Sequence, residues 1–207
     1  TMLKSKIKQS MIDSYNMCVA VDPVMIGLLQ SSPFFQGKHI GKDSRVIVYR
    51  GGKKLGYPNG VYARFQMVGA LPPYKQTLSD LLFSIKRRQV RWKQRMIKKK
   101  LDPNSMVRGD NALEFTWNPV KVNKLGTLEQ RSIDTNYLSN VIAISSLLKF
   151  IHRRIQQDFL KVMPSDIGEE EPFRIEGDVV YIPPHTTVRN RLQRRAAYYG
   201  LDDKEVW

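Results

Sequence analysis

The chain has little cysteine, few acidic residues and no long apolar run. Its 207 residues include a single cysteine, Cys18, which excludes an internal disulfide framework and fits a reducing compartment. No apolar stretch approaches the roughly 20 residues of a membrane-spanning helix, so we expect no transmembrane segment. Asp and Glu together number 19 against 34 Lys and Arg, which leaves a formal net charge of +15. Such an excess of positive charge favours a phosphate-rich partner.

Sequence motifs for catalysis or metal binding are also missing. The three histidines lie far apart, and none is spaced with Cys18 or with a pair of carboxylates as metal ligands are. The sequence has no Gly-x-Ser-x-Gly, no His-Glu-x-x-His and no phosphate loop that ends in Gly-Lys-Ser/Thr. Residues 51–54, Gly-Gly-Lys-Lys, share only their composition with a phosphate-binding nest. We therefore predict a protein that is not an enzyme and holds no metal or cofactor.

The pattern of apolar residues predicts a mixed α+β fold that starts with a small β-hairpin region. Residues 15–43 contain an apolar patch broken by proline, which indicates a short helix or a buried turn. Residues 44–49 and 61–68 are rich in β-branched and aromatic side chains and are predicted to be strands. Between them, residues 50–60 are predicted to form a basic, glycine-rich loop.

Two long helices are predicted to follow. The spacing of Thr77 and Asp80 is that of a capping box, so the first helix should span residues 78–101, with one apolar stripe and many cations elsewhere. A strand is expected at residues 113–117. The second helix should span residues 137–162, and its first half is apolar on nearly every side, as in a helix buried between neighbours.

The C-terminal part is predicted to contain a short strand and a basic helix, joined by extended loops. Residues 178–182 have the composition of a strand, and residues 187–199 that of a basic helix ended by Gly200. Six acidic residues between positions 166 and 178 form either a solvated loop, which we favour, or an internal counterweight to a basic helix. We divide the chain into residues 1–73, 74–163 and 164–207, within one compact unit with extensions.

The most informative feature is the basic run over residues 86–100. It holds nine cations in fifteen residues and no carboxylate. The charges spread over several sides of the predicted helix, more than one duplex groove could contact, which favours burial in a nucleic-acid assembly. Cations also occur beside aromatic residues at positions 45–64, 87–95 and 189–198, where tyrosine or tryptophan could stack on bases.

These patterns give a set of candidate RNA-binding residues. They are Arg45, Arg50, Lys53, Lys54, Arg64, Lys86, Arg87, Arg88, Arg91, Lys93, Arg95, Lys98, Lys99, Lys100, Arg153, Arg154, Arg189, Arg191, Arg194 and Arg195.

Three functions are compatible with the sequence. The first is a structural RNA-binding protein of a large ribonucleoprotein that contacts rRNA phosphates and neighbouring proteins; in general character the chain is similar to mitochondrial ribosomal proteins. The second is a ribosome-assembly or nucleic-acid-processing factor, which predicts a concave pocket with convergent polar residues. The third is a scaffold subunit of a mitochondrial protein complex. Lysines at positions 4, 6 and 8 are compatible with a trimmed transit peptide, so we expect the mitochondrial matrix, with the cytoplasm or nucleus as alternatives.

Overall fold

The computed structural model describes residues 2–105 and 111–206, with side chains from residue 6 onward. It is a mixed α+β structure, as predicted, with small separate sheets of two or three strands. The elements are α1 (Met2–Ala20), α2 (Asp22–Leu28), β1 (Phe34–Phe35), β2 (Lys38–His39), α3 (Ser44–Arg50), a 3-10 turn (Lys53–Leu55), α4 (Gln66–Gly69), α5 (Leu78–Lys98), a 3-10 turn (Ala112–Phe115), β3 (Val120–Val122), β4 (Leu128–Gln130), α6 (Leu138–Asp158), β5 (Lys161–Pro164), α7 (Asp166–Glu170), β6 (Ile175–Glu176), β7 (Val179–Ile182), α8 (His185–Thr187), a π-helical turn (Val188–Leu192), α9 (Gln193–Tyr199) and a 3-10 turn (Gly200–Asp202).

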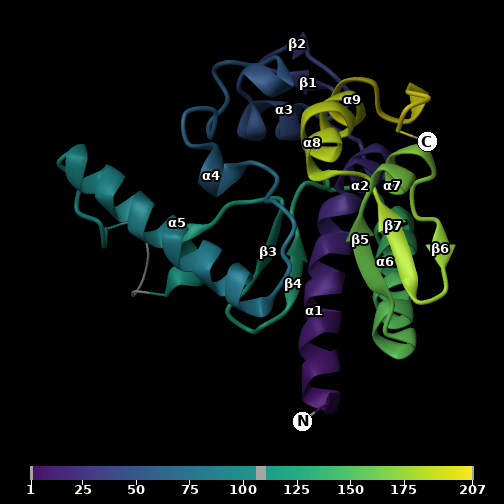
Figure 1. The fold of residues 1–207 in the computed structure, drawn as a ribbon. Coiled ribbons are helices and arrows are strands. Elements are labelled where there is room, and N and C mark those ends of the chain that lie inside the picture. The colour runs from purple at the N-terminus through teal and green to yellow at the C-terminus, as the bar shows by residue number, and fades with distance from the viewer. Residues whose placement is uncertain (1, 106–110, 207) are drawn as a thin grey trace.

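Helix α1 runs through the middle of the molecule (Figure 1). On one side, Met17 and Ala20 pack into a core with α6, β5 and β7, and on the other, Ile12 and Val19 pack into a core with α5 and β3. A third core joins α2, α3 and α9. Each core draws residues from at least two of the three predicted segments; the division into these segments stays a prediction.

The sequence did not reveal α1, because polar residues interrupt its apolar pattern. The structure shows how those polar residues are buried. Asn16 exchanges two hydrogen bonds of 2.8 Å with the backbone of Lys75, and Asp13 accepts a 3.0 Å hydrogen bond from the Val162 backbone N–H. These long-range bonds tie α1 to the start of α5 and to β5, and they satisfy polar groups that would otherwise be costly to bury.

The predicted strands at residues 44–49 and 61–68 are wrong. Residues 44–50 form α3, because the Asp43 side chain accepts a 2.8 Å hydrogen bond from the Val46 N–H and caps the helix. The β-branched Val46 and Ile47 are buried against α9, so tertiary packing overrides their strand propensity. Residues 61–64 are turns that lead into α4, and the N-terminal hairpin is the short pair β1–β2 instead.

The strand expected at residues 113–117 is also wrong, since a 3-10 turn occupies this position. The strands of this part form the hairpin β3–β4, in which Val120 pairs with Gln130. Strand β7 is confirmed near its predicted place, and it lies between β5, which is parallel to it, and β6, which is antiparallel. The short helix within residues 15–43 is confirmed as α2.

The two long helices differ in how well they match the prediction. Helix α5 begins as predicted, because Thr77 and Asp80 form a reciprocal capping box with hydrogen bonds of 3.0 and 3.1 Å. Helix α6 ends at Asp158, four residues early, since Phe159 adopts a left-handed conformation with φ of 51°. The predicted burial of its first half is wrong. Only Ile144 is buried there, whereas Leu138, Ile142 and Phe150 are 56–74% exposed and form an apolar outer face.

Candidate nucleic-acid interface

Helix α3 supplies the first side chains of a basic pocket. Asp43 caps the helix and fixes its start, which places Arg45 and Tyr49 one turn apart on the same face. Arg50 is the last residue of the helix and is buried. The fold of this short helix therefore determines how two arginines and a tyrosine are presented together.

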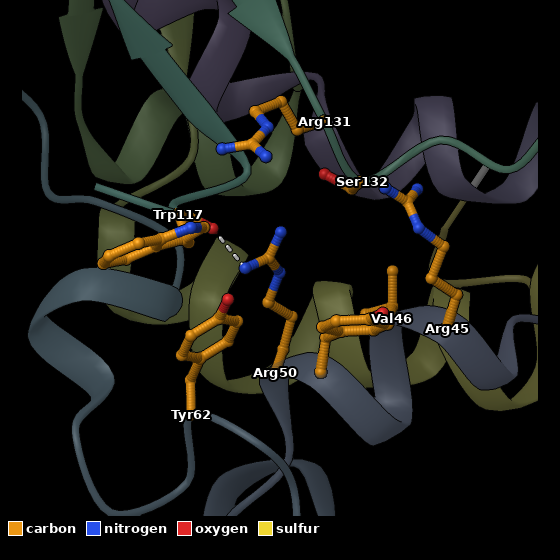
Figure 2. Close-up of a pocket in the computed structure, with 8 residues that line it drawn as sticks. Arg45, Val46, Arg50, Tyr62, Trp117, Arg131 and Ser132 are labelled. Atoms are coloured by element: carbon orange, nitrogen blue, oxygen red, sulfur yellow. Dashed lines mark hydrogen bonds between the residues drawn. The ribbon is translucent and has the colours of Figure 1, made fainter. Parts of the chain in front are cut away.

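Residues distant in sequence complete this concave site, which we call the arginine pocket. Figure 2 shows the Arg50 and Arg131 guanidinium groups pointing toward one another, with Trp117 beside them and Arg45 across from Ser132. The volume is about 190 Å³. Its lining residues are Arg45, Val46, Tyr49, Arg50, Tyr62, Trp117, Arg131 and Ser132. Three of these side chains are cationic and none is a carboxylate, so the charge of the lining is complementary to an anion.

Arg50 is held rigidly at the base of the pocket. Its Nη1 donates a 2.8 Å hydrogen bond to the Gly69 carbonyl and a short one to the Trp117 carbonyl (Figure 2), and its guanidinium lies 5.7 Å from the Tyr62 ring centre. Its Nε has no hydrogen-bond partner among the described residues. Burial lowers the pKa of Arg50 to about 10, against the charge of Asp22, which raises it, and with a smaller contribution from Arg131, so Arg50 remains charged at neutral pH. A buried cation with a free donor is ready to bind an anion.

The other two arginines are weakly neutralised. Arg45 is exposed and donates a 2.6 Å hydrogen bond to the Ile133 carbonyl. Arg131 lies 3.9 Å from the Glu129 carboxylate, at the limit of an ion pair, and its Nη1 is 3.5 Å from the Thr116 carbonyl. Arg45 thus donates to a neutral carbonyl, and Arg131 combines a contact of this kind with its long ion pair to Glu129.

Two buried carboxylates, Asp22 and Asp43, contact residues in or next to the pocket. Asp22 is fully buried and accepts hydrogen bonds from Ser132 Oγ and from the side-chain amides of Gln130 and Gln193 at 2.7 and 2.8 Å. Burial raises the pKa of Asp22 to about 6, although these donors oppose the shift. Burial, together with the charge of Asp134, raises the pKa of Asp43 to about 7. Asp22 thus ties α2 to β4 and α9, Asp43 caps α3, and neither acid lines the pocket.

An aromatic run leads from the arginine pocket to α5. Neighbouring ring centres lie 5.2–6.3 Å apart, and Tyr62 and Trp117 are stacked with an angle of 20° between their planes. The order along the run is Tyr49, Tyr62, Trp117, Trp92 and Phe65. The rings are half-buried or exposed, so their free edges and faces can contact a ligand. This run joins two surfaces that the sequence predicted separately, those at residues 45–64 and 87–95.

The position of Tyr62 in this run depends on a glycine. A Cβ atom added at Gly69 would lie 2.2 Å from the Cβ and 2.3 Å from the Cγ of Tyr62, closer than atoms in contact approach. Only glycine at position 69 therefore allows the ring to pack over α4, while the Gly69 carbonyl accepts the hydrogen bond from Arg50. One residue thus fixes both a ring and a guanidinium of the arginine pocket.

The basic run on α5 is mostly exposed. Among the described residues, no ion pair involves the exposed cations Lys86, Arg87, Arg91, Lys98, Lys99 and Lys100. Lys93 and Arg95 lie over the rings of Phe115 and Phe65, at 5.6 and 4.9 Å from the ring centres. Arg88 differs, because it is 5% exposed and lies beside Tyr15, which removes it from the contact surface.

The cations of the C-terminal helix contact acidic or polar side chains of the same chain. Arg191 forms ion pairs with Glu169 at 3.1 Å and Glu205 at 3.5 Å, and Arg195 pairs with the buried Asp203 at 2.8 Å. Arg189 donates a 2.7 Å hydrogen bond to the Gln66 side chain. The contact of Glu169 with this helix matches the counterweight alternative for the acidic segment. Arg194 and Arg195 also lie over rings, those of Tyr198 and Tyr199, at 5.9 and 6.0 Å from the ring centres.

The remaining candidate residues lie apart from these surfaces. Lys53, Lys54 and Arg64 are exposed, around the glycine-rich loop. Arg153 and Arg154 are exposed on α6, where Arg153 donates a 3.1 Å hydrogen bond to Gln157 and Arg154 pairs with Asp158. Their contact with RNA stays a prediction.

Sequence reasoning missed Trp117, Arg131 and Ser132. Trp117 and Arg131 lie 72 and 86 residues from Arg45, in a stretch that showed no motif, and they reach the pocket only through the fold around β3 and β4. No local pattern could have linked them to α3. A cation next to a buried serine in a loop is too common to predict a site.

Comparisons with protein families, with curated proteins and with solved structures found no match for this chain. Within residues 2–105 and 111–206, no three His, Cys, Asp or Glu side chains are grouped so that they could hold a metal ion. None of the helices described is both long enough and apolar enough to span a membrane. The function must therefore be argued from the geometry of the site.

Proposed function

We propose that this chain binds single-stranded RNA as a structural protein of a large ribonucleoprotein, with an organellar ribosomal subunit as the favoured assembly. The observation that carries the proposal is the continuity of the arginine pocket, the aromatic run and the cations of α5. Arginines in the pocket bind a phosphate, the rings offer stacking surfaces for bases, and α5 attracts the flanking backbone. Unpaired bases are required, because a duplex hides the faces that rings stack on.

The apolar outer face of α6 supports the expectation of protein neighbours. Leu138, Ile142 and Phe150 are exposed on this helix, with Leu147 at 42%. Exposed apolar side chains gathered on one helix face are typical of a surface that another protein covers. In a component packed among RNA and proteins, α5 would contact the RNA and α6 would contact a neighbouring protein.

A second candidate function is supported by the shape of the arginine pocket. A nucleic-acid-processing or assembly factor was expected to have a concave site with convergent polar groups, and this pocket has both properties. Its volume of about 190 Å³ is below the range of about 300–1,000 Å³ that is usual for small-molecule sites. The pocket therefore fits one phosphate group better than a whole mononucleotide, which favours the structural role.

The test is the binding of a fluorescent 12-nucleotide RNA, measured by anisotropy, against a mononucleotide and inorganic phosphate. We expect the double variant Arg45→Gln/Arg131→Gln to bind RNA at least tenfold more weakly, since each charged contact to phosphate contributes about 1–3 kcal/mol. The matched control is Lys38→Gln/Lys149→Gln, two exposed lysines that are neither in the pocket nor among the candidate RNA-binding residues, with an expected change below threefold. Tight binding of the mononucleotide and weak binding of RNA would support the second candidate. Equal losses in both variants would contradict a specific pocket.

A further inference from the structure

A second cavity lies between α1, α6 and the β3–β4 hairpin. It has a volume of about 820 Å³, within the range of small-molecule sites, and shares no lining residue with the arginine pocket. We call it the Cys18 pocket, after the only cysteine of the chain, which contributes to its wall. Neither the aromatic run nor the basic helix α5 takes part in it.

Four polar atoms of the Cys18 pocket are buried without a partner. They are the hydroxyl oxygens of Ser10 and Ser14, the side-chain carbonyl oxygen of Gln130 and Nδ1 of His152, and none has a hydrogen-bond partner among the described residues. Ser10 and Ser14 are only 6% and 3% exposed. A buried polar atom left unpaired costs about 1–3 kcal/mol, so four in one cavity indicate that something else supplies their partners.

The hydrogen-bonding character of this wall follows from Cys18 and His152. The Cys18 sulfur lies 3.4 Å from Nε2 of His152. Burial raises the pKa of Cys18 to about 12, so the thiol keeps its proton, and burial lowers the pKa of His152, which favours neutral imidazole. The neutral ring carries its proton on one of its two nitrogens, so Nδ1 can serve as donor or as acceptor. The wall offers this ring nitrogen, one carbonyl acceptor and two hydroxyls that can donate or accept.

The rest of the lining sets the charge of the ligand. No Lys, Arg, Asp or Glu is among the residues that line the cavity, and Ile7, Met11, Leu128, Leu148 and Phe159 provide apolar surface. The exposed Lys6 lies beside one lining residue, with its ammonium group 5.2 Å from the Phe159 ring centre. An ionised group inside would lose its hydration without a counter-charge, which is much more costly than burying a neutral amide or alcohol.

We propose that the Cys18 pocket binds an uncharged amphiphile, whose polar head hydrogen-bonds to Ser10, Ser14, Gln130 and His152 and whose apolar chain packs on Met11 and Leu148. A primary amide matches the wall best, because it carries two donors and one acceptor. The site does not depend on RNA binding, so the two proposals can fail separately.

The single cysteine gives a direct readout of occupancy. The rate at which N-ethylmaleimide modifies Cys18 is measured by mass spectrometry with increasing octanamide, and the heat of octanamide binding is measured by calorimetry. We expect saturating octanamide to slow modification at least tenfold. Octanoate and octylammonium, of the same length but charged, should slow it less than twofold. No protection and no binding heat with octanamide, or equal protection by all three probes, would overturn the proposal.

Two variants and one control connect the protection to this cavity. Ser14→Ala should weaken octanamide binding at least fivefold without lowering stability, because the unpaired hydroxyl contributes nothing to the empty fold. Leu148→Trp, which fills the cavity, should abolish binding. Ser146→Ala, the same change as the first but on the exposed side of α6, should leave binding unchanged. Unaltered binding in both pocket variants would contradict the assignment.

Discussion

Helix α5 and the C-terminal helix both carry runs of cations, and among the described residues the two helices differ in how those cations are paired. Arg191 and Arg195 pair with Glu169, Asp203 and Glu205, whereas the exposed cations of α5 are without ion pairs among the described residues. The difference teaches that a basic helix can serve either as an internal structural element or as a surface for an external polyanion. Which of these roles a basic helix has depends on the acidic residues that the fold places beside it.

The largest expected effect on stability breaks the internal network. Asp203 is 5% exposed and accepts hydrogen bonds of 2.9 Å from Arg195 Nε and from the Glu205 backbone N–H. Asp203→Ala should lower the free energy of unfolding by roughly 1–3 kcal/mol, because it removes two hydrogen bonds to a buried carboxylate. Asp102→Ala, at the exposed end of α5, should change it by less than about 0.5 kcal/mol. Urea unfolding checks both values, and equal losses would remove the distinction between the two helices.

A middle-sized effect concerns the start of α5, where a capping box fixes the first turn. The Thr77 hydroxyl accepts a 3.1 Å hydrogen bond from the Asp80 N–H in the capping box. Thr77→Ala should lower the free energy of unfolding by about 1 kcal/mol, and Thr77→Ser should restore most of it. Thermal unfolding followed by circular dichroism provides the measurement. An alanine variant as stable as the original would mean that the cap does not anchor the helix.

The smallest effect concerns the arginine pocket, whose cations lie near buried carboxylates without pairing with them. Burial raises the pKa of Asp43 from 3.8 to about 7, so folding favours its protonated form. Its contribution to stability is therefore present below about pH 4 and is lost as the pH rises through 7. Asp43→Asn keeps a helix-capping side chain and should make the decline between pH 4 and 7 shallower. Part of the decline in stability should remain in this variant, because the pKa of Asp22 is also raised, to about 6. Parallel pH profiles of the two proteins would contradict this assignment.

The parts of the fold that could be predicted depended on local signals. The capping box of α5, strand β7 and Gly200 after α9 are specified by neighbouring residues, and the structure has them as predicted. Helix α1 was missed because Asp13 and Asn16 are satisfied by backbone groups far along the chain. The strand propensity of Val46 and Ile47 was misleading for the same reason, since a distant helix, α9, buries them in a helical segment.

In the candidate site, too, the residues with local signals were predicted and those that depend on distant contacts were not. Arg45 and Arg50 were predicted from the cations and aromatics around them, and the structure places both in the arginine pocket. Their partners Trp117 and Arg131 carried no local signal. The internal pairing of Arg191 and Arg195 depends on Glu169 and on the last few residues, which composition alone could not match to particular arginines.

The most direct test of the account measures the salt dependence of RNA binding in two triple variants. Lys86→Gln/Arg87→Gln/Arg91→Gln removes charge from α5, and Arg191→Gln/Arg194→Gln/Arg195→Gln removes the same charge from the C-terminal helix. We predict that the first triple lowers the slope of log K against log salt for a single-stranded RNA by about 2, at about 0.7 per lost phosphate contact. The second should leave the slope unchanged in protein that is still folded. The same decrease in both, or in neither, would contradict the claim that α5 is the surface that faces RNA.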